Sequence, residues 1–475
     1  MKGNQMKRSV AFILAALLSL NGCSLGPNYM RAEQPFGATY YRPVRSGESV
    51  ANLPWWNVFT DPVLQNLIRQ SLNENKDLKV AVARIEQARA ILGFTRADQF
   101  PRIDVSGSAQ RVQSSDNVLS TGRQPFNNFG VFGDLTFELD IWGKLRRATE
   151  AEEATLLSTE YAERAIVISL VAQVASAYFK ILGIEDRLAI SDVTIKNRKS
   201  NTDLIQARFS KGMVPELDLN QAQIEEASAR ADKTDFERDL KQTEHALAIL
   251  LGKVPGDIPR GHPLVLQSLR DDLPTGFPAE LLQRRPDVLS AEEALRSEVA
   301  RIGVAEANRL PTITLLGFVG LNSEKTSNLV DANSFTWSIG GNLLGPLIDF
   351  GKYKSAVEAQ EANAKAALSF YEGAVIQAVR EVEDSIVAIQ TLKESLYQRE
   401  LQAKAARNAS RLSHARYDEG VTSYLEVLDI ERSLFQAELS ASLDRENYLK
   451  SIVQLFKALG GGWKEVEQSN TLIPR

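Results

Sequence analysis

The sequence has very little cysteine and histidine. Cys23 is the only cysteine among 475 residues, and the three histidines are His245, His262 and His414. This scarcity excludes a disulfide framework, a redox dithiol and a zinc site built from clustered cysteine and histidine. No glycine-rich loop of the Walker type is present, and no histidine is part of a catalytic triad pattern. We therefore expect no enzyme activity and no bound metal.

Strong charge of one sign and long apolar runs are also missing. Lys and Arg number 55 and Asp and Glu number 60, a formal net charge of −5 without basic runs. This balance argues against a nucleic-acid partner. The hydrophobic fraction of 44% is ordinary for a soluble protein, and we expect no helix of about 20 apolar residues that spans a bilayer.

The N-terminus has the layout of an export signal. Two basic residues precede an apolar run over residues 9–20, which is too short for a membrane span. The following Leu20-Asn21-Gly22-Cys23 resembles the lipobox of bacterial lipoproteins. The resemblance implies a signal peptide over residues 1–22 and an N-acyl, S-diacylglycerol cysteine at Cys23. An aspartate after the cysteine would favour retention in the inner membrane, but Ser24 stands there. The resemblance therefore implies the outer membrane of a diderm bacterium. The alternative is that Cys23 is a free buried cysteine.

The chain contains an internal repeat. A shift of 208 residues aligns the two halves without a gap over about a hundred residues, and the shift becomes 210 further upstream. The aligned pairs include Gly143 with Gly351, Ala207-Arg208 with Ala415-Arg416, Gly212 with Gly420, Leu217 with Leu425, and Leu251-Gly252 with Leu459-Gly460. The repeat predicts an N-terminal segment at 23–60, one unit at 61–270, a second at 271–463 and a tail at 464–475.

Proline placement predicts very long helices. Residues 144–210 and 352–418 contain no proline and are rich in helix-forming residues. Each predicted helix of about 67 residues is roughly 100 Å long, which requires coiled-coil-like neighbours. Shorter helices are predicted at 215–251, 423–459, 72–100 and 282–309. The break at 252–281 holds five prolines and predicts a non-helical belt beside the helices.

Four segments of about 10 residues alternate loosely between apolar and polar side chains, which suits tilted transmembrane strands. They cover residues 102–112, 128–139, 312–322 and 335–343. Alternation alone fits soluble hairpins equally well, but the lipid anchor favours strands in the outer membrane, where only closed barrels span. Four strands cannot close, two chains give eight strands with a filled interior, and three give twelve with a lumen. We therefore favour a homotrimer whose helices continue the cylinder.

Motifs along the whole mature chain carry a family resemblance. They are Cys23-Ser24-Leu25-Gly26-Pro27-Asn28-Tyr29, Trp55-Trp56 with Phe59-Thr60-Asp61-Pro62, Gln283-Arg284-Arg285-Pro286-Asp287, Gly345 to Gly351, and Leu459-Gly460-Gly461-Gly462-Trp463. Their order resembles the outer membrane factor family, in its lipoprotein branch that serves multidrug pumps. The resemblance implies a membrane α+β fold: a trimeric 12-stranded β-barrel with four strands per chain, a long periplasmic α-helical barrel and a mixed equatorial belt.

The same resemblance implies a function and partners. It implies a passive exit channel for drugs or small amphiphiles, served by a periplasmic adaptor and an inner-membrane resistance-nodulation-division transporter. The adaptor would dock at the helical tips, which we place at Gly212, Met213, Val214, Gly420, Val421 and Thr422. We expect Met213, Val214 and Val421 to be exposed there and to form a small apolar contact surface. Plain helix-turn caps are the alternative.

The resemblance also places a gate just past the second tip. It implies that Leu425 is an apolar plug and that Glu426 and Asp429 form acidic rings that favour cations. Asp218 and Tyr417 match positions that hold the tip shut through links between helices. Thr422 departs from the family pattern, because some members carry a basic residue there. A solvated helix surface is the alternative for each of these residues.

Two other functions remain open at this point. A structural periplasmic coiled-coil lipoprotein would explain the anchor and the helices, but not the four strand-length segments. An outer-membrane channel for metal ions or for secreted proteins would share the architecture. Four methionines in the whole chain argue against a path lined with soft metal ligands.

Overall fold

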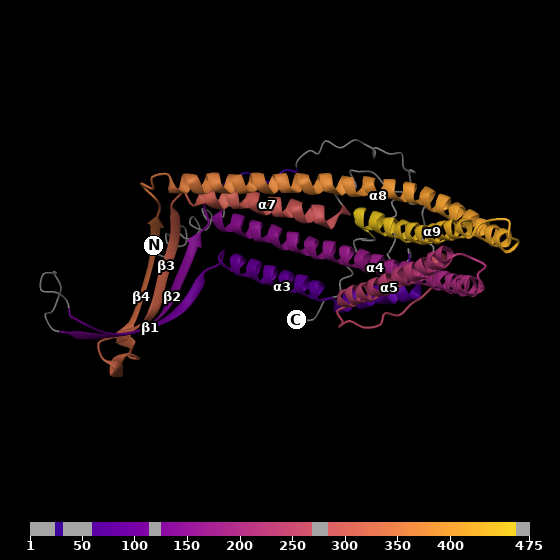
Figure 1. The fold of residues 1–475 in the computed structure, drawn as a ribbon. Helices are drawn as coiled ribbons and strands as arrows, with labels where there is room; N and C mark the ends of the chain where they lie inside the picture. The colour runs from indigo at the N-terminus through magenta and orange to yellow at the C-terminus, as the bar shows by residue number, and fades with distance from the viewer. Residues whose placement is uncertain (1–23, 32–58, 114–124, 268–283, 462–475) are drawn as a thin grey trace. The chain divides into compact units, whose positions relative to one another are not determined.

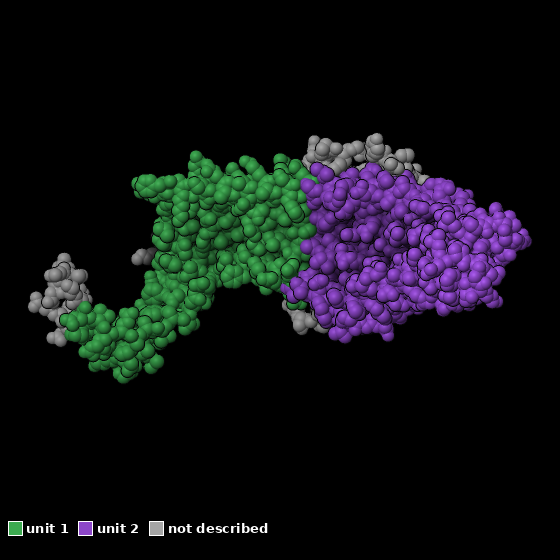
Figure 2. Space-filling view, in the orientation of Figure 1, with its two compact units in different colours: residues 1–33, 84–160, 290–372 green, residues 34–83, 161–289, 373–475 purple. Residues whose placement is uncertain are grey.

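The computed structural model describes residues 24–31, 59–113, 125–267 and 284–461. The proposed lipidation site Cys23, the signal peptide and the Trp55-Trp56 pair lie outside these residues. The chain forms two compact units, each assembled from separate stretches of sequence (Figure 2). Unit 1 contains residues 1–33, 84–160 and 290–372, and unit 2 contains residues 34–83, 161–289 and 373–475.

The two long helices lie where the absence of proline predicts them. Helices α4 (Lys144–Ser210) and α8 (Lys352–Asp418) each have 67 residues (Figure 1). Each is followed by a helix of 35 residues, α5 (Glu216–Leu250) after α4 and α9 (Tyr424–Ala458) after α8. The two repeats therefore contain equivalent helical hairpins of equal length.

The remaining helices differ from the prediction in the first repeat. Among the described residues, the second repeat has α7 (Pro286–Ala307) and a helical residue, Arg284, just before it, while in the first repeat residues 72–100 do not form one helix as expected. Two helices occupy this region, α2 (Pro62–Glu74) and α3 (Lys76–Ala97). The break lies at Asn75, whose side-chain oxygen accepts the Leu78 amide hydrogen at 3.0 Å. Asn75 thus caps the start of α3 and competes with a continuous helix.

The four strands form one antiparallel sheet in the order β1-β2-β3-β4 (Figure 1). They are β1 (Arg102–Val112), β2 (Phe126–Leu139), β3 (Thr312–Ser323) and β4 (Phe335–Leu344). Strands β2 and β3 come from different repeats and pair side by side. The sheet consequently joins the two repeats and leaves β1 and β4 as its edges.

The strand register gives the sheet one apolar and one polar face. Neighbouring strands place side chains of the same kind opposite each other, because successive residues point to opposite faces. The apolar face contains Ile103, Val105, Phe129, Val131, Leu135, Phe137, Leu315, Val319, Leu321, Phe335, Trp337, Ile339 and Leu343. The other face contains Asp104, Ser106, Ser108, Gln110, Asn128, Asp134, Thr136, Glu138, Thr314, Asn322, Thr336, Ser338 and Asn342. Its exceptions are Phe132, Leu316, Phe318 and Leu344, together with the pair Val112 and Phe126 at the far end of β1 and β2.

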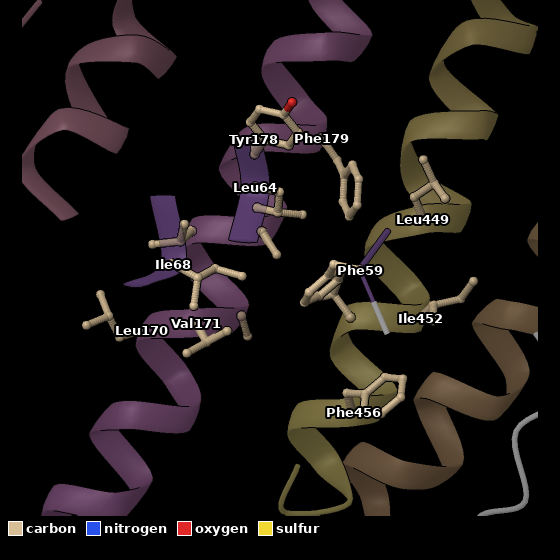
Figure 3. Packing of buried hydrophobic residues seen from close by; sticks show 14 of the residues in the cluster. Phe59, Leu64, Ile68, Leu170, Val171, Tyr178, Phe179, Leu449, Ile452 and Phe456 are labelled. Carbon is tan, nitrogen blue, oxygen red and sulfur yellow. The ribbon is translucent and has the colours of Figure 1, made fainter. Parts of the chain in front are cut away.

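The main hydrophobic core lies in unit 2, where α2, α4 and α9 meet (Figure 3). Tyr178 and Phe179 of α4 are fully buried, and the Phe179 ring lies 6.2 Å from that of Phe59. One 18-residue window of α4 has a mean hydropathy of 1.9, enough for a membrane span by composition, and 56% of it is buried in the protein. Our expectation that no such stretch exists is therefore wrong, and core packing accounts for its apolar character.

A buried carboxylate fixes the segment that follows α5. Asp61 begins α2 and accepts hydrogen bonds from the Tyr178 hydroxyl at 2.8 Å and the Gln267 side chain at 2.7 Å. The amide of His262 also donates to Asp61, at 3.1 Å. Burial by itself raises the pKa of the Asp61 carboxyl group, because it disfavours the charged form. The hydrogen bonds have the larger combined effect, and the pKa is lowered. The described part of the predicted belt is therefore attached to the helices, while residues 268–283 lie outside the described residues.

Candidate functional site

The two helical tips have the same backbone structure. Gly212 and Gly420 have φ of 67° and 72°. This left-handed conformation is unfavourable for any residue that carries a Cβ atom. After each glycine the next amide bonds back to the carbonyl five residues earlier, Met213 to Arg208 at 3.0 Å and Val421 to Arg416 at 2.9 Å. This is the Schellman ending of a helix. Both glycines therefore terminate a long helix where the sequence predicts it.

A small hydrophobic cluster lies beneath the tips. We call it the tip cluster, and its buried members are Ile205, Leu219, Ala222, Tyr424, Val427 and Leu428, with Phe209, Val214 and Tyr417 packed against them. These residues come from α4, α5, α8, α9 and the first turn, so the cluster joins both hairpins. Val214 is half-buried in it. Our prediction that Val214 is exposed is therefore wrong, because its side chain packs inward.

Tyr417 contributes a contact between the hairpins at the tip through Arg208. Its ring lies 5.5 Å from the ring of Tyr424, and the guanidinium of Arg208 lies 5.0 Å above it. Arg208 also lies 4.0 Å from the Asp418 carboxylate. Within the residues that the structure describes, no hydrogen bond joins Tyr417 to Asp218. Both lie near Tyr424, whose pKa is raised by burial first and then by surrounding charges that include Asp218.

The predicted gate residues occupy two environments on α9. Leu425 is 56% exposed and Asp429 is exposed as well, one helical turn apart on one face. The opposite face, with Val427 and Leu428, is buried in the tip cluster. Leu425 and Asp429 consequently point away from their own hairpin and are available to another molecule or to a lumen.

Glu426 differs from these two because it has partners in its own chain. It accepts a hydrogen bond from the Thr422 hydroxyl, and the Arg416 guanidinium lies 3.7 Å from its carboxylate. Arg416 supplies a positive charge from α8 to this contact. The structure thus brings Thr422, Arg416 and Glu426 together at the second tip.

The remaining predicted tip residues form an exposed apolar surface. Met213 is 68% exposed and Val421 is 65% exposed, as predicted. Leu217, in the first turn of α5, is 62% exposed and extends this surface beyond the predicted residues. Several exposed apolar side chains close together at the helical tips are typical of a contact surface.

A buried ionic cluster near the tip was not predicted from the sequence. Glu225 of α5 lies 3.2 Å from Arg198 of α4 and 2.5 Å from Arg432 of α9. The side chains of Arg198 and Glu225 are only 5% and 9% exposed. A buried charge is stable only when it is paired; Arg198 pairs with Glu225 within the first hairpin, and Arg432 connects Glu225 to the second hairpin.

A second polar cluster includes the one histidine of the tip region. His414 of α8 lies 2.7 Å from the carboxylate of Glu431 in α9, and Asn201 of α4 donates to the same oxygen at 2.9 Å. The hydrogen bond to Glu431 raises the pKa of His414, although partial burial opposes the shift. These residues line a cavity of about 330 Å³ between the helices. The sequence shows the histidine, but it does not show which residues of other helices contact it.

Comparison with known proteins decides the family. The model of the outer membrane efflux protein family matches residues 67–253 and again residues 277–461. The chain belongs to the outer membrane efflux protein family. The double match confirms the internal repeat, and the family excludes the alternative of a structural periplasmic lipoprotein.

Individual relatives agree with this membership over nearly the whole length. The chain is 32% identical to the antibiotic efflux pump outer membrane protein ArpC of Pseudomonas putida over 97% of both chains. It has the same identity and coverage with a toluene efflux pump outer membrane protein, TtgC, also of Pseudomonas putida. The solved structure of the outer-membrane channel OprN is 30% identical with a TM-score of 0.86, covering 93% of this chain and 100% of that chain. The predicted family, fold class and outer-membrane location are thereby confirmed.

Proposed function

We propose that three copies of this outer-membrane efflux protein form the exit channel of a tripartite pump. The main support is the four-stranded sheet, which has one apolar and one polar face and two edge strands, β1 and β4, that are each paired on one side only. Its apolar face suits lipid and its polar face suits a water-filled lumen. The backbone groups along the outer sides of β1 and β4 must be paired inside a bilayer, and β4 of one copy can pair with β1 of the next. Three sheets of four strands then close a twelve-stranded barrel.

The protein acts as a passive duct and not as an enzyme. The energy and the choice of substrate come from an inner-membrane transporter of the resistance-nodulation-division class, which a periplasmic adaptor connects to the duct. The exposed apolar residues of the tips, Met213, Leu217 and Val421, support docking of the adaptor at the glycine turns. Drugs and other small amphiphiles are the proposed cargo, because relatives are named for antibiotic and toluene efflux.

The gate of this duct is formed by the exposed face of α9. In a trimer, Leu425 recurs three times as an apolar plug, while Asp429 and Glu426 recur as acidic rings that favour cations. Tyr417 and Asp218 hold the hairpins in the closed arrangement through the tip cluster that both approach. At Thr422, the contact that keeps the tip closed at rest is the one that Glu426 makes with Thr422 and Arg416.

The mature chain is attached to the outer membrane by lipid on Cys23. The support is the sequence Leu20-Asn21-Gly22-Cys23 after an apolar signal segment. The acyl chains anchor the protein, whereas the strands span the bilayer. The two membrane contacts are therefore separable by mutation.

The exported Cys23→Ser protein tests this function. Without lipid, its strands still require detergent, and we expect a detergent-bound trimer by native mass spectrometry that forms channels in planar bilayers. A monomer that stays in solution without detergent would exclude the barrel. The unmodified protein, purified in the same way, is the control for the contribution of the lipid.

A further inference from the structure

The polar face of the sheet contains an aromatic pair. Phe132 of β2 and Phe318 of β3 lie on this face, with ring centroids 5.4 Å apart and an edge-to-face angle of 79°. Their cross-strand neighbours Ser106 and Ser338 are polar. The apolar face already carries the aromatic residues that lipid requires, so lipid contact does not explain this pair.

The sheet provides space for the pair by means of two glycines. A Cβ atom added to Gly130 or to Gly320 would overlap the Phe132 ring. The ring therefore covers the backbone of both glycines, and neither position accommodates a side chain without displacing it. This arrangement holds Phe132 flat along the sheet and leaves Phe318 36% exposed beside it.

Two carboxylates lie next to the aromatic pair on the same face. Asp134 is the register partner of Phe318 on one side and of Asp104 on the other. Asp104 is paired with Arg102 at 2.8 Å. Asp134 accepts a hydrogen bond from Ser106 at 2.5 Å, and no lysine or arginine in the described part of the sheet forms an ion pair with it. Directly opposed like charges are unfavourable in a sheet, and the half-buried Asp134 carboxylate beside a ring complements a cation.

We propose that Phe132, Phe318 and Asp134 form a weak binding site for lipophilic cations in the lumen of the barrel. This inference rests on the proposed function, because the polar face lines a lumen only if three chains close the barrel. The rings bind the apolar body of the ligand, and the carboxylate together with the ring faces attracts its positive charge. One site per chain places three sites around the exit path. A channel site must be weak enough to release what it binds, which an open sheet surface satisfies.

Block of the ionic current by tetraphenylphosphonium tests the site. The purified full-length trimer is inserted into a planar bilayer. The cation is added to the chamber on the side of the barrel mouth, opposite the helices. We expect current block by tetraphenylphosphonium at concentrations where tetramethylammonium, a cation without the apolar body, and tetraphenylborate, an apolar anion, have no effect. A bilayer without protein corrects for the current carried by the probe itself.

Matched variants assign the block to these residues. We expect Phe132→Ala with Phe318→Ala to weaken the block at least about tenfold, and Asp134→Asn to weaken it severalfold. Phe137→Ala removes a ring from the apolar face of the same strand and should leave the block unchanged. If the alanine variant does not assemble, Phe132→Leu with Phe318→Leu keeps apolar volume and should still weaken the block.

The outcomes separate this inference from the proposed function. If the wild-type protein conducts but tetraphenylphosphonium does not block it, or if the block is the same in the Phe132, Phe318 and Asp134 variants, the binding site is refuted and the channel stands. If no preparation forms conducting channels, the proposed function itself is wrong.

Discussion

The two helical tips share a backbone and differ in their ionisable side chains. Both end at a glycine of positive φ with the same pair of hydrogen bonds. At the offset of 208 residues, the first tip has neutral residues where the second has ionisable ones: Gln206 for His414, Phe209 for Tyr417, Gln221 for Asp429, Gln223 for Glu431 and Ile224 for Arg432. The repeat therefore duplicates the backbone frame but not the positions of the ionisable groups, since the first hairpin in turn has Arg198 and Glu225 where the second has Ala406 and Ser433.

This difference gives the hairpins different tasks. Two side chains of the second hairpin contact the first: Arg432 forms an ion pair with Glu225, and Glu431 accepts a hydrogen bond from Asn201. The first hairpin contributes the exposed Met213 and Leu217. We infer that the first tip is mainly a contact surface and the second mainly the gate. The following predictions test that division, beginning with the largest expected effect.

Glu225→Ala should produce the largest loss of stability at the tip. It removes the partner of buried Arg198 and of Arg432, and breaking a buried pair typically costs about 3–5 kcal/mol. We expect much faster hydrogen exchange of the amides near the tip, measured by mass spectrometry. Glu226→Gln is the control, because its partner Arg230 is 54% exposed and lies one turn further along the same helix, a contact worth about 1 kcal/mol or less. Equal exchange in the two variants would show that Glu225 does not connect the hairpins.

Tyr417→Ala should have a smaller effect of the same kind. The change removes the ring that contacts Tyr424 and Arg208, and we expect a loss of about 1–3 kcal/mol because Tyr417 is only partly buried. Tyr417→Phe keeps the ring and reproduces Phe209 of the first repeat. Thermal unfolding of the tip, followed by hydrogen exchange, should therefore distinguish alanine from phenylalanine. If phenylalanine is as destabilising as alanine, the hydroxyl and not the ring is the essential part.

His414 should give the second hairpin a modest pH dependence. Its pKa is raised by Glu431, so the contact is fully present below the ordinary histidine pKa of about 6.5 and is lost as the pH rises through the higher value of the folded protein. After the intrinsic base-catalysed exchange rate is divided out, we expect the protection of the tip amides to fall on the alkaline side, by less than about tenfold. His414→Gln copies Gln206 and should abolish this dependence. A pH profile that survives the substitution would assign it to another group.

Much of the fold was predictable because it depends on local chemistry. The long helices follow from the missing prolines between Pro125 and Pro215 and from the glycine turns, and the strand lengths follow from alternation. The break at Asn75 was missed, although an asparagine before a helix-forming run is a typical cap. The strand order and the pairing of β2 with β3 depend on long-range contacts that no local pattern specifies.

The site was predictable in part for the same reason. The glycine turns and the exposed Met213 and Val421 are local features. The burial of Val214 and the pairing of Glu225 with Arg432 depend on how two hairpins more than two hundred residues apart pack together. Glutamate on a helix looks the same in sequence whether it is solvated or buried, so Glu225 had no distinguishing signal.

Single-channel recording of the Glu426→Ala, Asp429→Ala trimer tests the central claim most directly. If the exposed face of α9 forms the acidic gate, the conductance in planar bilayers should rise and the preference for cations over anions should fall. Gln221→Ala changes the equivalent position of the first repeat and should behave like the wild type. Unchanged conductance and unchanged selectivity in the double variant would contradict a gate in the second hairpin.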